Sequence, residues 1–421
     1  MVENRASVNA IARKRMKVAQ RAFDFDKDLA AIKRIWREIG WTDEDSEKQL
    51  DLFFGCGRTV VGTLDDVAEC SVHTVPGSIR LASTDLSLCA VTAVTTSRVA
   101  RGQSFARKLT AEQLQHARAQ GVAMAALGMF DQGFYDQLGF GTGAYDHQLT
   151  FDTASLTVPI LTRNPVRLTP EDSGECHAAL LKRKREHGAV CLDPPEVFKA
   201  ELGFSKDSFG LGFRDANGEL THFIWLETED EVLRGPYSLR AWAYRSAEQL
   251  LELLSLLRSL SDQVYSVTLM EPPELQLQAL LRRPMRHMVL TRGSKHASTF
   301  NTMAWYQLRV LDVAQVVQAL PPIRSRLQFA LQVTDPLSEY GEQHCAGDYV
   351  VSLDKTSTAI REANTDLPKL SCSINAFTRW VFGVAPASSL ALTDSFTAEP
   401  ELLQTLDATL QLPRPILGWD F

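Results

Sequence analysis

The sequence lacks several features that would mark common classes of protein. Its seven cysteines are scattered and no two form a Cys-x-x-Cys pair, which argues against a zinc site or a disulfide framework. No apolar run approaches the length of a membrane-spanning helix, and no apolar segment of a signal peptide follows the basic stretch near the N-terminus. Lys and Arg number 44 against 51 Asp and Glu, so a basic face for nucleic acid is not expected.

These absences leave the composition of an ordinary soluble chain, 45% apolar and 23% charged. We expect the cysteines to be buried free thiols in a reducing, cytoplasmic environment. His116 and His147 have no partners at ligand spacing, so no metal site is expected. The net charge of −7 suits a cationic small molecule better than a nucleic acid as a partner.

The length of 421 residues is too great for one core, and the patterns predict three domains. The first, 1–152, alternates strands and helices as a mixed α/β sheet, with a helix capped by Asp26 and a closing strand at 148–151. The second, 153–310, repeats this layout. Its helices are predicted at 246–260 and 273–281, and its closing strand at 305–310. The third, 311–421, is smaller and leads out through Pro413-Arg414-Pro415.

One strand-to-helix turn in the first domain carries an anion-binding pattern. The turn follows the β-rich residues Val94, Thr95 and Thr96, and it consists of Arg101, Gly102, Gln103, Ser104, Phe105 and Ala106. Backbone N–H groups at a helix N-terminus point toward phosphate oxygens, and Arg101 would add a charge-assisted donor. The alternative reading is an ordinary helix cap. The matching turn of the second domain, at 244–247, has no glycine and no such arginine.

Together with Tyr135 and the ending Asp420-Phe421, this turn resembles the Eis type (enhanced intracellular survival) of N-acetyltransferases in the GNAT superfamily. The resemblance implies an α/β (α+β) fold of two tandem GNAT-like mixed-sheet domains, the second degenerate, followed by a domain like sterol carrier proteins. It also implies acetyl-CoA as co-substrate. The strand at 94–96 would pair with its pantetheine arm, and the turn at 101–106 would bind its pyrophosphate.

The same resemblance assigns chemistry to Tyr135 and to the chain end. Tyr135 would protonate the departing thiolate of coenzyme A, and the Phe421 carboxylate would reach back into the first domain. We expect the tail 419–421 to be ordered and buried there, anchored by the ring of Trp419 or Phe421, with its carboxylate within a water's reach of the Tyr135 hydroxyl. Members of this family acetylate amines, notably aminoglycosides, and form hexamers from two trimers. The turn departs from the family pattern because Ser104 stands where glycine is usual, so we expect a working loop with slightly less room.

The acceptor site is expected after the first helix. Trp41 stands there beside four acids between 43 and 47, a set that suits a polycation, although a solvated helix cap would look the same. Asp420 would add negative charge for an ammonium group. Two alternatives to a small-amine acetyltransferase stay open. One is a catalytically weak scaffold or lipid-binding protein, and the other is an enzyme that acetylates protein lysines.

Overall fold

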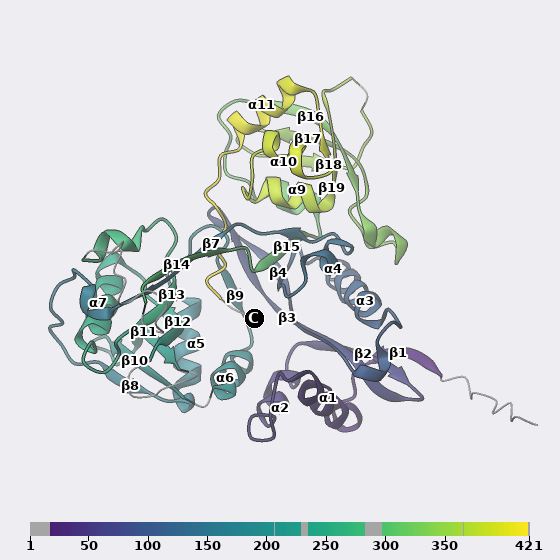
Figure 1. Cartoon of the computed structure of the whole chain (residues 1–421). Helices are drawn as coiled ribbons and strands as arrows, with labels where there is room; N and C mark the ends of the chain where they lie inside the picture. The colour runs from purple at the N-terminus through teal and green to yellow at the C-terminus, as the bar shows by residue number, and fades with distance from the viewer. Residues whose placement is uncertain (1–16, 206, 229–234, 283–296, 365, 420–421) are drawn as a thin grey trace, which may run out of the picture.

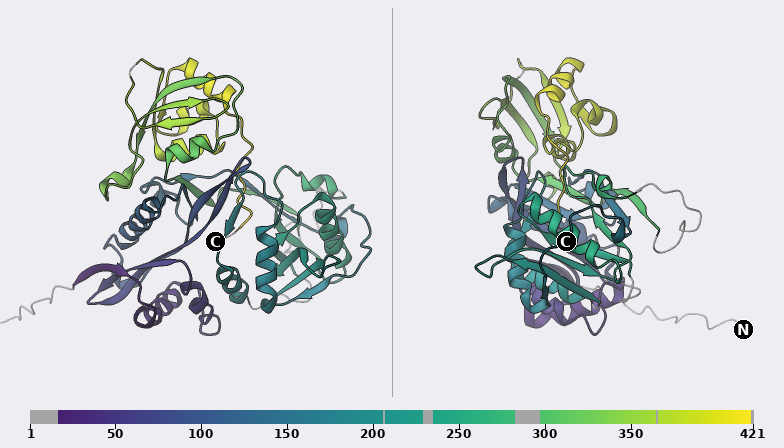
Figure 2. Two further views of the ribbon diagram at one scale, coloured as in Figure 1. Left: turned by 180° about the vertical axis from the view of Figure 1, so that it is seen from behind. Right: turned by 90° about the vertical axis from the view of Figure 1, so that its left-hand side faces the viewer.

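The computed structural model describes residues 17–205, 207–228, 235–282, 297–364 and 366–419, and three β-sheets form in this part of the chain. Two larger mixed sheets with their helices lie side by side, and a smaller unit follows them in the sequence (Figure 1). Views from behind and from the side show the third unit stacked on the junction of the other two (Figure 2). The predicted fold class is therefore confirmed.

The first sheet has the strand order β1-β2-β3-β4-β5-β15-β6, with β9 paired to β3 off this path. Its strands are β1 (Val18–Ala22), β2 (Arg58–Leu64), β3 (Val67–Leu81), β4 (Thr84–Thr96), β5 (Met124–Gly128), β6 (Gly141–Thr142), β9 (Val190–Leu192) and β15 (Tyr306–Val310). Its helices are α1 (Phe25–Ile39), α2 (Gln49–Phe54), α3 (Phe105–Ala119) and α4 (Gln132–Asp136).

Alternation along β2 shows how this sheet separates two cores. Successive side chains of a strand point to opposite faces. Val61 accordingly joins the core that contains Trp36 of α1, whereas Val60 joins the core that contains Leu109 of α3. The N-cap of α1 is Asp24, whose side chain accepts from the N–H of Lys27. The expected cap at Asp26 is wrong, because the helix starts two residues earlier than the charge pattern indicated.

The second sheet has the order β14-β7-β13-β12-β11-β10-β8. Its strands are β7 (Asp146–Phe151), β8 (Val166–Leu168), β10 (Ser208–Arg214), β11 (Leu220–Glu227), β12 (Tyr237–Ala243), β13 (Val267–Met270) and β14 (Thr299–Met303), and its helices are α5 (Ser173–Leu181), α6 (Pro195–Phe204) and α7 (Ala247–Ser259). The helix expected at 273–281 is only the 3-10 turn Leu277–Leu280. Glu274 has a φ of 62°, a left-handed conformation that prevents a helix from starting at the prolines before it.

The first two units exchange their closing strands. We expected 148–151 to close the first sheet, but β7 pairs with β13 and β14 of the second. We expected 305–310 to close the second sheet, but β15 pairs with β5 and β6 of the first. Both assignments are therefore wrong, although both segments are strands. Each sheet is completed by a strand from beyond the predicted boundary, and the boundaries at 152 and 310 remain predictions about folding units.

The third unit is a sheet of order β18-β17-β16-β19-β20 with its own helices. Its strands are β16 (Leu327–Thr334), β17 (Gly347–Leu353), β18 (Thr358–Ile360), β19 (Lys369–Ser373) and β20 (Phe396–Thr397), and its helices are α8 (Val313–Gln318), α9 (Ile374–Val381), α10 (Ala387–Thr393) and α11 (Pro400–Thr409). After α11 the chain runs back between the first two units, as the yellow segment in Figure 1 shows.

The strand exchange makes a prediction about fragments. A fragment of residues 1–152 lacks β15, so β5 would present an unpaired edge and β7 would have no partner strands. We expect this fragment to show no cooperative thermal transition in circular dichroism, whereas a fragment of residues 1–321, which contains both exchanged strands, melts cooperatively. Cooperative melting of 1–152 near the temperature of the full chain would contradict the prediction.

Candidate active site

Two central strands of the first sheet diverge where a ligand arm is expected. β4 and β5 pair as parallel strands only as far as Val91 of β4. Thr92 then bulges out of the ladder with β3, because consecutive ladder pairs pass from Val91 directly to Ala93. A bulge bends its strand and increases the local twist. The rest of β4 therefore stays with β3 and leaves β5.

Val94, Thr95 and Thr96 occupy this diverging part of β4. Their ladder joins them to β3, and among the described residues no strand pairs with their other edge. Thr95 is buried, and its hydroxyl lies 2.8 Å from the hydroxyl of Ser71. An edge with unpaired N–H and C=O groups is a template for an extended chain. This edge can therefore receive a ligand arm that carries amide groups.

The turn that follows β4 presents backbone N–H groups at its tip. Arg101, Gly102, Gln103 and Ser104 are exposed, and Gly102 and Ser104 have positive φ angles of 81° and 58°. Ser104 is the N-cap of α3, yet its side chain makes no capping hydrogen bond. The N–H groups of the first helical turn thus remain available to an anion, and Arg101 can add a charged donor.

Phe105 supports this turn from the inside. Its side chain is 2% exposed and its ring packs on Gly62 of β2. A Cβ atom at position 62 would collide with the ring, so glycine is what lets α3 start so close to the sheet. We predicted that Phe105 contacts the cofactor. Because its side chain is buried, only its backbone N–H can face a phosphate. Ala106, half-buried, continues the first turn of the helix.

Tyr135 lies on α4 inside an aromatic cluster. Asp131 caps this short helix by accepting from the N–H of Phe134. The Tyr135 ring is 2% exposed and meets the rings of Phe134, Phe130 and Phe140 at 4.9, 5.9 and 6.1 Å. Burial, helped by the charge of Asp131, raises the pKa of the Tyr135 hydroxyl well above its usual range. The phenol is therefore protonated at neutral pH, which is the state that a proton donor requires.

Trp41 stands at the seam between the first two units. It is 46% exposed, and its ring meets the ring of Trp36 edge-on at 5.3 Å. Trp36 in turn stacks on Phe204 at the end of α6, which belongs to the second unit. The exposed face of Trp41 is therefore a surface that a ligand could cover, and it is held in place by an aromatic row across the seam.

The acids beside Trp41 carry less uncompensated charge than their number suggests. Arg37 lies 3.7 Å from Glu44 and 3.3 Å from Glu47. Asp43 accepts from both the N–H and the hydroxyl of Ser46, which closes the loop on itself. Part of this acidic set thus serves the loop and the end of α1, as the alternative reading of a solvated cap proposed.

The returning tail is held by backbone hydrogen bonds to a segment near β9. The N–H of Ile416 donates to the carbonyl of His187 at 3.1 Å, and the carbonyl of Leu417 accepts from the N–H of Val190 at 2.9 Å. This pairing resembles the addition of an edge strand. It brings the chain between the first and second units (Figure 1).

Trp419 is the last described residue, and it is buried. Its ring meets the rings of His177 on α5 and Phe198 on α6 at 6.0 and 6.1 Å, and the guanidinium of Arg183 lies 5.7 Å from its centre. We expected this ring to anchor in the first domain. The structure instead anchors it on the second unit, because α5 and α6 offer ring surfaces and a cation for its indole.

The two terminal residues that we assigned to catalysis and acceptor binding, Phe421 and Asp420, lie outside the described residues. The structure therefore does not test whether the Phe421 carboxylate comes within a water's reach of the Tyr135 hydroxyl. That placement stays a prediction. The described part of the tail shows only that the chain is docked as far as Trp419.

Two buried polar groups beside the bulge were not singled out from the sequence. The ring of His73 lies 4.9 and 5.1 Å from those of Phe53 and Phe54, and burial lowers its pKa to about 3. Its Nδ1 lies 2.8 Å from the Thr59 hydroxyl, while its Nε2 and the Thr92 hydroxyl have no hydrogen-bond partner among the described residues. His73 stands inside an apolar strand, and this pattern could have indicated a buried polar group from the sequence. The bulge at Thr92 leaves no such signal in the sequence.

Comparisons with known proteins agree with this geometry. Residues 23–143 match the family model of the acetyltransferase (GNAT) domain, and residues 313–418 match that of the sterol carrier protein domain. Among solved structures, the chain is similar to Eis1 from Mycobacterium abscessus, with a TM-score of 0.74 and 15% identity over 96% of this chain and 100% of that one. A GCN5-related N-acetyltransferase from Anabaena variabilis is similar with a TM-score of 0.76, at the same identity and coverage. None of the curated proteins matches the chain in sequence.

The chain thus contains a GNAT acetyltransferase domain at residues 23–143, and the prediction of a GNAT-type acetyltransferase is confirmed at that level. Within the superfamily it has the Eis-type arrangement, in which a GNAT domain comes first and a sterol carrier protein domain last. Among the described residues, no group of His, Cys, Asp and Glu could hold a metal ion, and no helix is long and apolar enough to cross a membrane.

The left-handed conformation of Ser104 makes a prediction about the turn. Glycine adopts a positive φ freely, whereas a β-branched residue is strained there by roughly 1–2 kcal/mol or more. We expect Ser104→Gly to bind coenzyme A at least as tightly as the native chain, and Ser104→Val to bind it about tenfold more weakly. Titration calorimetry measures both affinities. Equal binding by the glycine and valine variants would show that the turn does not hold the ligand.

Proposed function

We propose that the chain is an acetyl-CoA-dependent N-acetyltransferase that moves the acetyl group directly to an amine in a ternary complex. The observation that carries the proposal is the divergence of β4 from β5 at Thr92, which opens an unpaired edge that leads to the N-terminus of α3. An extended arm that ends in a pyrophosphate matches this order. Its amides would pair with Val94, Thr95 and Thr96, and its charge would meet the turn that starts at Arg101.

In the proposed reaction the amine nitrogen attacks the thioester carbonyl. A C–N bond forms, the C–S bond breaks, and the sulfur leaves with a negative charge that must be neutralised. Tyr135 is the proposed proton donor. Its raised pKa keeps it protonated but also makes it hold its proton firmly. We therefore infer that its hydroxyl first stabilises the sulfur by a hydrogen bond and transfers the proton late, when charge has developed there.

The amine must lose a proton, and the Phe421 carboxylate is the proposed group beside it. A terminal carboxyl has a reference pKa of about 3.5 and an alkylammonium one of roughly 10.4, so direct abstraction is uphill by several units. The carboxylate and Asp420 serve better as anions that hold the ammonium group, while a water molecule relays the proton. The attraction between these anions and the ammonium group would then decide which amines bind.

Cationic amines such as aminoglycosides are the acceptors that we propose. The net charge of −7, the exposed ring of Trp41 and the two anionic groups of the terminus, Asp420 and the chain-end carboxylate, support this class. Acetylation of protein lysines is the second candidate, since the exposed Trp41 ring could also lie against a protein substrate. A non-enzymatic scaffold or lipid-binding role is the third. We further propose domains at 1–152, 153–310 and 311–421, a cytoplasmic location and a hexamer of two trimers.

A thiol-release assay tests the function. The chain should release coenzyme A from acetyl-CoA when an acceptor is added from a panel of aminoglycosides, polyamines and lysine peptides. Arg101→Glu should weaken acetyl-CoA binding at least tenfold, because it replaces a charged donor with a repelling carboxylate. The matched control is Arg167→Glu, which makes the same charge change at an exposed position of β8. No release with any acceptor would overturn the proposal and favour the scaffold.

A C-terminal extension tests the role of the terminus. Adding a few residues converts the Phe421 carboxylate to an amide and removes one negative charge from the proposed acceptor site. We expect kcat to fall about 10²-fold, the usual scale for a misplaced reacting group, with acetyl-CoA affinity changed less than twofold. An extension of equal length at the N-terminus is the control. Native turnover by the C-terminally extended chain would leave the tail a purely structural element.

A further inference from the structure

The segment that carries Tyr135 is held by a residue of the third unit. Asn375 lies in the first turn of α9, and its side-chain amide donates to two backbone carbonyls of the first unit. The acceptors are the carbonyl of Asp136, at 3.0 Å, and the carbonyl of Phe140, at 2.8 Å. These carbonyls flank the turn that ends α4. One amide group from the folded body of the third unit therefore spans the segment just after Tyr135.

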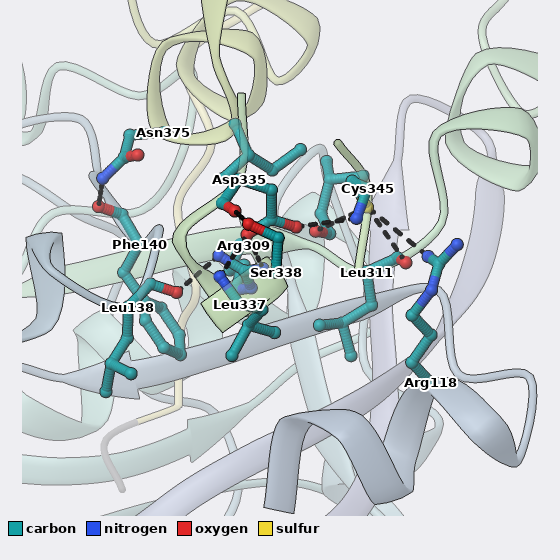
Figure 3. A network of polar contacts seen from close by, with 12 residues as sticks. Arg118, Leu138, Phe140, Arg309, Leu311, Asp335, Leu337, Ser338, Cys345 and Asn375 are labelled. Atoms are coloured by element: carbon teal, nitrogen blue, oxygen red, sulfur yellow. Dashed lines mark hydrogen bonds and ion pairs between the residues drawn. The ribbon is translucent and has the colours of Figure 1, made fainter. Parts of the chain in front are cut away.

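A buried ion pair holds the middle of the same segment. Arg309 of β15 and Asp335, which follows β16, have side chains that are 0% exposed, and Nη2 of Arg309 lies 2.7 Å from Oδ1 of Asp335. Nη1 of Arg309 donates to the carbonyl of Leu138. Figure 3 shows the guanidinium between Leu138 on one side and Asp335 on the other.

The carboxylate of Asp335 is itself held. It accepts from the N–H groups of Leu337 at 2.9 Å and Cys345 at 2.7 Å. Burial alone would raise the pKa of Asp335, but the Arg309 guanidinium and the N–H donors of Cys345 and Leu337 together keep the pKa below its usual value. The pair is therefore ionised and hydrogen-bonded, so both charges are oriented rather than merely close.

The shape of the segment is matched to the guanidinium. Gly139 has a φ of 82°, and a Cβ atom there would overlap Nη1 of Arg309 and touch Ile374. Glycine is thus required twice, for its backbone angle and for the space that the arginine fills. This explains Gly139 by a contact with β15, a strand that the first sheet takes from far along the chain.

We propose that Asn375 and the Arg309–Asp335 pair are positioning residues for Tyr135. They hold the carbonyls at 136, 138 and 140, so the third unit and β15 together fix where α4 presents its tyrosine. The proposal rests on the proposed function, because it assumes that the Tyr135 hydroxyl meets the departing sulfur. A displacement of about 1 Å at a reacting group can cost on the order of 10²-fold in rate.

The burial of a charged pair supports a role beyond stability. Two fully buried charges stabilise a fold little compared with apolar side chains of similar size, although removing one partner alone is costly. The guanidinium also directs a hydrogen bond at one chosen carbonyl, which an apolar side chain cannot do. The arrangement therefore trades stability for a defined position of the segment after Tyr135.

Asn375→Ala is the deciding variant, because this side chain is half-buried and its loss leaves the core intact. We expect kcat to fall ten- to a hundredfold, with KM for acetyl-CoA within twofold of the native value. The matched control is Gln332→Ala. Gln332 is also half-buried in the third unit, but its amide donates to Asp348 of the neighbouring strand. This control should keep native kcat.

Tyr135→Phe separates positioning from general support. If Asn375 acts through the tyrosine, Asn375→Ala should change kcat less than threefold in a Tyr135→Phe chain. An equal loss of kcat in both backgrounds, or native kcat in the single variant, would overturn the proposal. Unchanged kcat in Tyr135→Phe itself would also overturn it, since there would be no catalytic hydroxyl to position.

The outcomes of these experiments also distinguish the positioning role from the proposed function. Absence of thiol release by the native chain with every acceptor overturns the function, whatever the variants do. Release by the native chain with normal turnover of Asn375→Ala overturns only the positioning role. Asp335→Asn adds a second measurement if it folds, and it should reproduce the kcat effect of Asn375→Ala with the same dependence on Tyr135.

Discussion

The strand β15 is the constraint on which the arrangement of the three units depends. It leaves the second unit, enters the first sheet beside β5 and β6, and continues through Leu311 and Asp312 into α8 of the third unit. Without it, β5 would have an open edge on its far side from β4. Because this strand is paired inside the first sheet and is joined at its two ends to the second and third units, its pairing fixes where both connections leave the first sheet.

The same strand carries polar groups into the interior. Gln307 and Arg309 are two residues apart and so lie on one face of β15, and both are 0% exposed. Gln307 donates to the side chain of Asp136, whose pKa is raised by burial, and Arg309 donates to the carbonyl of Leu138. Buried polar groups are costly unless they are paired. Partners of both side chains lie in the segment after Tyr135. The hydrogen bonds to this segment therefore offset part of the free-energy cost of burying Gln307 and Arg309.

Much of this architecture was predictable, because helical periodicity and strand alternation depend on local patterns. The helix α7 and the strand-to-helix turn at Arg101, with α3 after it, lie where the sequence placed them. The strand exchange was not predictable. Two units of similar layout have closing strands of similar sequence pattern, and no local pattern indicates with which sheet each strand pairs. The sequence of β15 is itself misleading. Its alternation indicates a solvent-facing side for Gln307 and Arg309, whereas a loop from the first unit covers that side.

The site shows the same division between local and long-range information. The positions of Ser104 and Tyr135 follow from adjacent turns and caps, so the sequence located them. The bulge at Thr92 and the partners of Trp419 depend on elements far away in the chain, so it did not. Trp419 was placed in the first domain because the family resemblance sends the tail there, but an indole packs wherever rings and a cation are offered, and α5 and the residues around it offer them.

The docking of the tail can be accounted for without its last two residues. Val190 links the carbonyl of Leu417 to the first sheet, because Val190 also pairs with Ile79 of β3 through β9. The Tyr306 hydroxyl donates to the carbonyl of Pro415 and accepts from the N–H of Ala144. Burial of a Trp ring contributes several kcal/mol, at roughly 25 cal/mol per Å² over about 200 Å². That offsets part of the entropy cost of ordering the tail, roughly 1–2 kcal/mol per residue, and the backbone hydrogen bonds offset more of it. Changes confined to the chain end should therefore alter chemistry while the tail stays docked.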